Sequence, residues 1–158
     1  GDRAKNRLIP DLISSLSRNE SLLLRNPNSV RPWQYVLDPL LGYLMIGQKI
    51  LSGSEVYETY NFGPKLDTFL TVSDFVAEVQ KFIPFRYQVE KNGLNLESNI
   101  LKIDSSRAIT DLQWNLYTSI PKGIEYLLKL DSNNIAPRDM TNHVYEFFAD
   151  TVLNVNFS

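Results

Sequence analysis

Arginines, turn-forming residues and an aromatic side chain are concentrated in one short segment, RNPNSVRPW at residues 25–33. A guanidinium group pairs bidentately with phosphate oxygens, and the ring of Trp33 stands close to Arg31 in the sequence. The segment therefore predicts a site for a ligand that carries both phosphate and a ring. The alternative is structural: a turn before a helix, with solvated arginines or with Arg31 paired to a carboxylate such as Asp38.

Composition limits the other kinds of chemistry. The 158 residues suffice for one ordinary domain, and 43% hydrophobic and 22% charged residues are typical of a soluble globular protein. The net charge of −2 argues against binding to nucleic acid or to an anionic membrane, because both attract positively charged surfaces. Without cysteine there are no disulfides, thiolate metal sites or cysteine nucleophiles. His143 is the only histidine, and we expect it at a helix surface or end.

No apolar run approaches the roughly 20 residues of a membrane-spanning helix, and the N-terminus has no signal-peptide core. We therefore expect no membrane partner and a cytoplasmic location.

Hydrophobic periodicity predicts helices that alternate with short strands, which is an α/β pattern. The expected helices cover residues 8–16, 33–51, 105–112, 119–130 and 139–149, with another from the N-cap Thr71 to just before Pro84. The expected strands cover residues 22–24, 56–62, 85–89 and 100–104. These elements contain no Gly-rich dinucleotide turn, P-loop, G-x-S-x-G elbow or H-E-x-x-H motif. From its residues alone, the chain reads as a binding domain without a visible catalytic centre.

Four segments carry a resemblance to a known family. They are residues 1–11 (GD-x4-RLIPD), residues 25–44 (RNPNSVRPWQYVLDPLLGYL), residues 60–64 (YNFGP) and residues 101–108 (LKIDSSRA). Together they resemble the CDP-glucose 4,6-dehydratases, which are extended short-chain dehydrogenases/reductases of carbohydrate and lipopolysaccharide O-antigen biosynthesis. The resemblance implies a lyase that oxidises the sugar at C4 with NAD, eliminates water across C5 and C6, and returns the hydride.

Under this resemblance, residues 1–158 would form the C-terminal, nucleotide-sugar-binding portion of the enzyme. The N-terminal NAD-binding domain, with its Gly-rich turn and Tyr-x-x-x-Lys pair, would precede Gly1. This chain alone would then hold no catalytic residue, bind neither NAD nor a metal, and lack activity. Whether it acts as an enzyme by itself is left open.

The resemblance assigns the CDP-sugar site to Arg7, Leu8, Leu24, Arg25, Arg31 and Asn61. Arg7 and Leu8 would pack on the base, with Leu24 and Arg25 flanking it. Arg31 would grip the diphosphate and Asn61 would lie near the same ligand. Turn and capping roles are the alternative for Arg7, Arg25 and Asn61. For Trp33 and Tyr35, packing is preferred over stacking on a ligand.

Departures from the family pattern keep other functions open. Residues 94–99 (LNLESN) replace a histidine-rich run, and Tyr35 stands in place of a histidine. The chain could therefore be a structural or interaction remnant that binds no sugar nucleotide, or a related epimerase or dehydratase with another base.

The family architecture also implies a partner. The helix after RPWQ and the segment ending in YNFGP would pack on the absent domain, which predicts exposed apolar surface from Leu40 to Ile50 and from Val56 to Phe62. We expect that this surface drives self-association, that it docks on a separately made N-terminal half, or that the chain folds only marginally.

Overall fold

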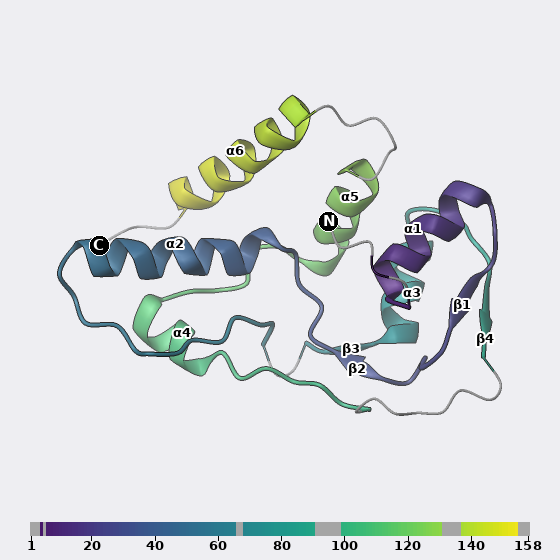
Figure 1. Cartoon of the computed structure of the whole chain (residues 1–158), viewed down its shortest axis with the longest axis horizontal. Coiled ribbons are helices and arrows are strands. Elements are labelled where there is room, and N and C mark those ends of the chain that lie inside the picture. The colour runs from purple at the N-terminus through teal and green to yellow at the C-terminus, as the bar shows by residue number, and fades with distance from the viewer. Residues whose placement is uncertain (1–3, 5, 66–67, 91–98, 131–136, 155–158) are drawn as a thin grey trace. The chain divides into compact units, whose positions relative to one another are not determined.

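The structure is a computed structural model that describes residues 4, 6–65, 68–90, 99–130 and 137–154. The chain divides into two compact units: unit 1 is Gly1–Arg31 with Leu70–Lys102, and unit 2 is Pro32–Phe69 with Ile103–Ser158. Unit 1 contains α1 (Leu8–Arg18), β1 (Leu22–Leu24), β2 (Val30–Arg31), β3 (Leu70–Thr71), α3 (Val72–Gln80) and β4 (Tyr87–Val89) (Figure 1). Unit 2 contains α2 (Leu37–Leu51), α4 (Ser106–Leu112), α5 (Ile120–Leu130) and α6 (Pro137–Asn154).

Unit 1 is organised around the parallel strands β1 and β4, which place Leu22 opposite Tyr87. Along β1 the side chains alternate: Leu22 and Leu24 are at most 1% exposed, whereas Leu23 is 42% exposed. Helix α1 packs against β1 and contributes the fully buried Leu12. The core of this unit therefore lies on one face of β1.

The turn at residues 26–29 holds the N-terminus of α3. The expected N-cap Thr71 is confirmed and forms a capping box. The N–H groups of Val72 and Ser73 donate to the carbonyls of Ser29 and Pro27, both at 2.9 Å. First-turn N–H groups have no acceptor inside their own helix, so these loop carbonyls satisfy them. The Asn-Pro-Asn turn thus has a structural role beside any role in binding.

The core of unit 2 surrounds Trp114, which is 1% exposed. Its ring packs edge-on against Phe62, with centroids 5.2 Å apart, and Ala108 and Leu112 of α4 complete the buried cluster. The indole Nε1 donates to the backbone carbonyl of Asp38 at 2.9 Å. This bond joins the first turn of α2 to the core.

Asp38 is fully buried and binds two backbone groups through one oxygen. Its Oδ1 accepts the N–H groups of Tyr117 at 2.9 Å and Thr118 at 3.2 Å. Its Oδ2 is buried without a hydrogen-bond partner among the described residues. Burial raises the pKa of Asp38 above its ordinary 3.8, and this effect outweighs the bonds from Tyr117 and Thr118, which lower it.

Several elements differ from the sequence-based expectation. The predicted strand at residues 100–104 is wrong: Ile100 forms an isolated parallel bridge with Val30, and residues 101–105 have no regular secondary structure. Helix α2 begins at Leu37 rather than near residue 33, because Pro39 is tolerated only in the first turn of a helix. Residues 56–62 form no strand. Their backbone is bound by side chains instead of by a neighbouring strand; for example, Gln34 Nε2 donates to the Phe62 carbonyl at 2.9 Å. Helix α6 begins earlier and ends later than expected, with Pro137 at its first position, where proline is favourable.

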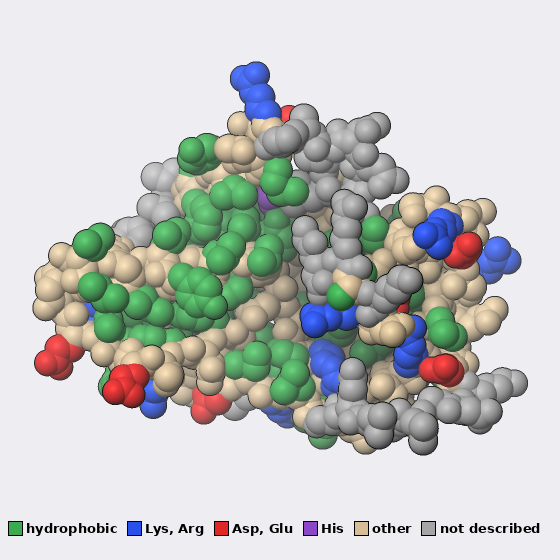
Figure 2. Space-filling view, in the orientation of Figure 1, with side chains coloured by type: hydrophobic (Ala, Val, Ile, Leu, Met, Phe, Trp, Pro, Cys, Tyr) green, Lys and Arg blue, Asp and Glu red, His purple; other side chains and the backbone are tan. Residues whose placement is uncertain are grey.

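One face of α2 and of the residue before it is apolar and exposed. Its large side chains are between 40% and 89% exposed, namely Val36, Leu40, Tyr43, Leu44, Ile50 and Leu51. Figure 2 shows hydrophobic side chains gathered over this part of unit 2. The predicted exposure from Leu40 to Ile50 is confirmed at Leu40, Tyr43, Leu44 and Ile50, whereas Leu41 is buried. Along residues 56–62 it holds at Tyr57 but is wrong at Phe62, which is buried in the Trp114 cluster.

Two glycines of α2 provide a matched test of the packing in unit 2. A Cβ at Gly42 would lie 2.3 Å from a ring carbon of Phe62, whereas a Cβ at Gly47 meets nothing within 4 Å. We expect Gly42→Ala to destabilise the fold by about 1–3 kcal/mol through overpacking. We expect Gly47→Ala to stabilise it by about 0.5–1 kcal/mol through helix propensity. Urea unfolding measures both, and equal effects of the two substitutions would contradict the Gly42–Phe62 packing.

The raised pKa of Asp38 predicts a specific pH dependence of stability. Because the folded state binds the Asp38 proton more tightly than the unfolded state does, protonated Asp38 stabilises the fold. This stabilisation is complete below pH 3.8 and is lost as the pH rises through the pKa that Asp38 has in the folded state. Asp38→Asn removes this titration and keeps an oxygen that can accept from Tyr117 and Thr118. The unfolding free energy of the parent minus that of the variant should therefore fall with rising pH. A difference that stays constant above pH 3.8 would show that Asp38 titrates normally.

Candidate functional site

The six residues assigned to the CDP-sugar site are distributed over both units. Arg7, Leu8, Leu24, Arg25 and Arg31 belong to unit 1, and Asn61 belongs to unit 2. Unit 1 thus carries all the guanidinium groups of the predicted site, and unit 2 carries its amide.

Arg25 follows β1, and its guanidinium reaches the N-terminal end of α1. Nη2 donates to Asn6 Oδ1 at 2.8 Å, and Nη1 lies 3.4 Å from Asp11 Oδ2. Asn6 has a left-handed φ of 69°, which asparagine adopts more readily than most residues do. The side chain of Arg25 remains 37% exposed. Arg25 therefore has an observed structural role, and its contact with a ligand stays a prediction.

The other expected base contacts lie at the start of α1 and in β1. Arg7 is the extended N-cap residue of α1; its side chain is exposed, and its carbonyl accepts the N–H of Asp11 at 3.0 Å. Leu8 opens the helix and is partly buried. Leu24 is 1% exposed, and its carbonyl accepts the N–H of Glu90 at 2.9 Å. Leu24 therefore belongs to the core of unit 1, and Arg7 is the member of this group that reaches the surface.

Arg31 lies in β2, opposite Leu70 of the antiparallel strand β3. Its Nη1 donates to the carbonyl of Val30 at 2.9 Å, which bends the side chain back along its own strand. Asp38, the carboxylate named as an alternative partner, instead directs Oδ1 to backbone N–H groups of unit 2.

Tyr35 packs in an aromatic cluster of unit 2, as its preferred interpretation predicted. Its ring lies 5.1 Å from that of Tyr126 and 5.9 Å from that of Phe147, and its hydroxyl is 2.6 Å from Nε2 of His143. The expectation that His143 is a surface or helix-end residue is wrong. His143 lies within α6, away from both helix ends, and its side chain is partly buried. Burial lowers the pKa of His143 and raises the pKa of Tyr35 to about 12, so both groups are neutral near pH 7.

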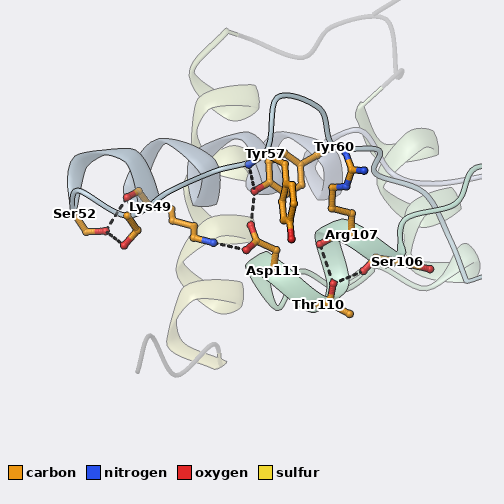
Figure 3. Close-up of polar contacts among 9 residues, drawn as sticks. Lys49, Ser52, Tyr57, Tyr60, Ser106, Arg107, Thr110 and Asp111 are labelled. Atoms are coloured by element: carbon orange, nitrogen blue, oxygen red, sulfur yellow. Dashed lines mark hydrogen bonds and ion pairs between the residues drawn. The ribbon is translucent and has the colours of Figure 1, made fainter.

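Asn61 lies beside a polar network that the sequence did not reveal. Its Nδ2 donates weakly, at 3.4 Å, to the carbonyl of Asp104. The neighbouring Tyr60 donates its hydroxyl to the carboxylate of Asp111 on α4, and Lys49 of α2 forms an ion pair with the same carboxylate (Figure 3). Lys49 and Asp111 are 62 positions apart, so no local spacing could have paired them.

Protonation states show what this network does. Hydrogen bonds from Lys49 and Tyr60 hold the pKa of Asp111 below its ordinary value, and the bond to Asp111 raises the pKa of Lys49. Desolvation, followed by the bond to Asp111, raises the pKa of Tyr60. A tyrosine that acts as a general base near neutral pH needs a lowered pKa. Tyr60, whose pKa is raised, is therefore suited to donate a hydrogen bond to Asp111 and not to act as a general base.

Other kinds of site find no support in the described residues. None of the described helices is long and apolar enough to cross a membrane. No cluster of three or more potential metal ligands occurs within the described part of the chain. Of the segment that replaces the family's histidine run, residues 94–98 lie outside the described residues.

Comparison with known proteins tests the resemblance. No family model matches the chain. The chain is 34% identical over 143 residues to the CDP-glucose 4,6-dehydratase of Salmonella typhimurium, a match that covers 89% of this chain and 40% of that protein.

Solved structures show a similar fold. The dTDP-glucose 4,6-dehydratase from Bacillus anthracis, in complex with NAD, matches with a TM-score of 0.62 at 18% identity over 81% of this chain and 40% of its own. The UDP-glucose 4-epimerase from Bifidobacterium longum, in complex with NAD⁺ and UDP, matches with a TM-score of 0.68 at 16% identity over 84% and 41%. The chain thus spans about two fifths of the length of these relatives. Both the predicted fold class and the predicted resemblance are confirmed: the chain has the α/β fold of part of an extended short-chain dehydrogenase/reductase, and its sequence is similar to CDP-glucose 4,6-dehydratase.

Proposed function

We propose that this chain is the nucleotide-sugar-binding portion of a CDP-glucose 4,6-dehydratase. The observation that carries the proposal is the 34% identity to that enzyme across 89% of this chain. The complete enzyme would convert CDP-glucose to CDP-4-dehydro-6-deoxyglucose and water. NAD would be bound by another portion, because this sequence has no Gly-rich dinucleotide turn. The chain alone is then a binding module without activity.

The exposed arginine side chains of unit 1 fit this role chemically. Arg25 keeps a partly exposed guanidinium at the end of β1, and Arg7 is exposed at the start of α1. Guanidinium groups have five donors, of which the bonds from Arg25 to Asn6 and Asp11 occupy only some. Diphosphate oxygens are suitable acceptors for the remaining donors.

A different function is favoured by other observations. Asp11 and Asn6 already bind Arg25, Leu24 is enclosed in the core, and the histidine run is replaced. These features fit a remnant that no longer binds sugar nucleotides and serves as an interaction module. A related epimerase or dehydratase with another base is the third candidate. The cytoplasmic location stays a prediction.

A titration of the chain with CDP-glucose, monitored through its amide proton/nitrogen NMR signals, distinguishes these functions. We expect saturable shifts that are stronger than those caused by UDP-glucose. Arg31→Lys keeps the charge but loses the planar fork, so it should weaken binding by about tenfold. Arg18→Lys, in the last turn of α1, is the control and should bind as the parent does. Dispersed peaks that ignore both ligands would favour the remnant, and equal shifts with both would favour another base.

The apolar face of α2 supports a partner for this module. We propose that it docks on an NAD-binding portion and that, without that portion, the face drives self-association. Analytical ultracentrifugation should show oligomers of the parent chain. Leu44→Glu should weaken them by about tenfold or more, since an unpaired carboxylate in an interface costs more than the roughly 1.4 kcal/mol that a factor of ten represents.

Gln48→Glu adds the same charge at an exposed polar position of α2 and is the matched control. A parent chain that sediments as a stable monomer would contradict self-association.

A further inference from the structure

We propose that Asp111 and Tyr60 are positioning residues that present the amide of Asn61 to a nucleotide sugar. This inference rests on the proposed function and adds to it residues that the resemblance does not assign. It depends on three observations: the unusual way residues 57–62 are held, the burial pattern around Asn61, and the unused acceptor of its amide.

Residues 57–62 belong to no helix or strand, and hydrogen bonds from side chains hold their backbone instead. Arg107 of α4 donates to the carbonyl of Thr59 at 2.9 Å and also to its hydroxyl at 3.0 Å. The guanidinium of Arg107 lies 4.9 Å from the ring centroid of Tyr57. Helix α4 therefore holds the start of the segment from one side.

Asp111 holds the middle of the segment. Its carboxylate binds the hydroxyl of Tyr60 and the ammonium of Lys49, so one residue connects α4, α2 and the segment (Figure 3). The side chains of Lys49 and Asp111 are 24% and 19% exposed, which shields their ion pair more than an ordinary surface pair. The Tyr60 hydroxyl also accepts the backbone N–H of Tyr57 at 3.0 Å. Removing the hydroxyl would release both bonds together.

The burial pattern fixes where Asn61 lies. Phe62 is buried against Trp114, and the ring of Tyr60 is stacked on that of Phe62 at 6.4 Å with 13° between the planes. Asn61, between these two anchored rings, is exposed. Its orientation therefore depends on its neighbours being held.

The amide of Asn61 retains binding capacity. Its only bond to the described residues is the long one from Nδ2 to the Asp104 carbonyl, and Oδ1 accepts none from them. An amide oxygen accepts O–H or N–H donors. A sugar hydroxyl or the exocyclic amine of cytosine supplies such a donor, and both occur in a CDP-sugar.

The experiment compares Tyr60→Phe with Thr110→Ala. The first removes the hydroxyl and keeps the stacked ring. The second removes a hydroxyl of α4 whose bonds to the described residues stay within that helix, to the carbonyls of Ser106 at 2.9 Å and Arg107 at 3.3 Å. In the ligand-free chain, ¹⁵N relaxation of residues 59–61 should show lost order in Tyr60→Phe and none in Thr110→Ala. The indole N–H signal of Trp114 reports that the core is intact in both.

Binding of CDP-glucose is the second measurement. Tyr60→Phe should bind about three- to tenfold more weakly, the range expected when one side chain must be ordered on binding. In an Asn61→Ala background the same substitution should have no further effect, because Tyr60 acts through Asn61.

The possible failures are distinguishable. If the parent chain does not bind CDP-glucose, the proposed function fails and this role fails with it. If the parent binds and Tyr60→Phe behaves like Thr110→Ala, only the positioning role is overturned. Additive effects of Tyr60→Phe and Asn61→Ala would likewise overturn it.

Discussion

Unit 2 depends on the buried residue Asp38, which binds parts of the chain that are far apart in sequence. Its carbonyl accepts the indole N–H of Trp114, and its carboxylate accepts two backbone N–H groups, across separations of 76 to 80 residues. Each of these bonds matters for stability, because a buried donor left without an acceptor costs about 1–3 kcal/mol. Helix α2 is thereby fixed to the core that also contains Phe62, and the segment bearing Asn61 inherits its position from that core.

The segments that stand out chemically in this sequence also have structural roles. The Asn-Pro-Asn turn supplies carbonyls to the start of α3, and Arg25 binds the beginning of α1. An arginine that is held by Asn6 and Asp11 has already lost part of its side-chain freedom, so less would remain to be lost on binding a phosphate. Structural and binding roles are therefore compatible at the same residue.

Local patterns predicted the parts of the fold that depend on neighbours in sequence. The amphipathic period of α1, the apolar run of β1 and the capping residue Thr71 all appear as expected. The irregular segment at residues 56–62 was predicted wrongly as a strand, because its apolar and aromatic residues are typical of strands but find no strand to pair with. The network of Lys49, Tyr60 and Asp111 could not be predicted, since it joins positions up to 62 residues apart.

The exposed face of α2 has a consequence for the life of the protein in a cell. Surfaces of this kind are what chaperones and proteases recognise on incompletely assembled chains. A chain made without a partner over Leu40, Tyr43 and Leu44 would be held or degraded, so its abundance would follow that of the partner. Under the proposed docking, the same face would both receive the partner and mark unassembled copies for removal.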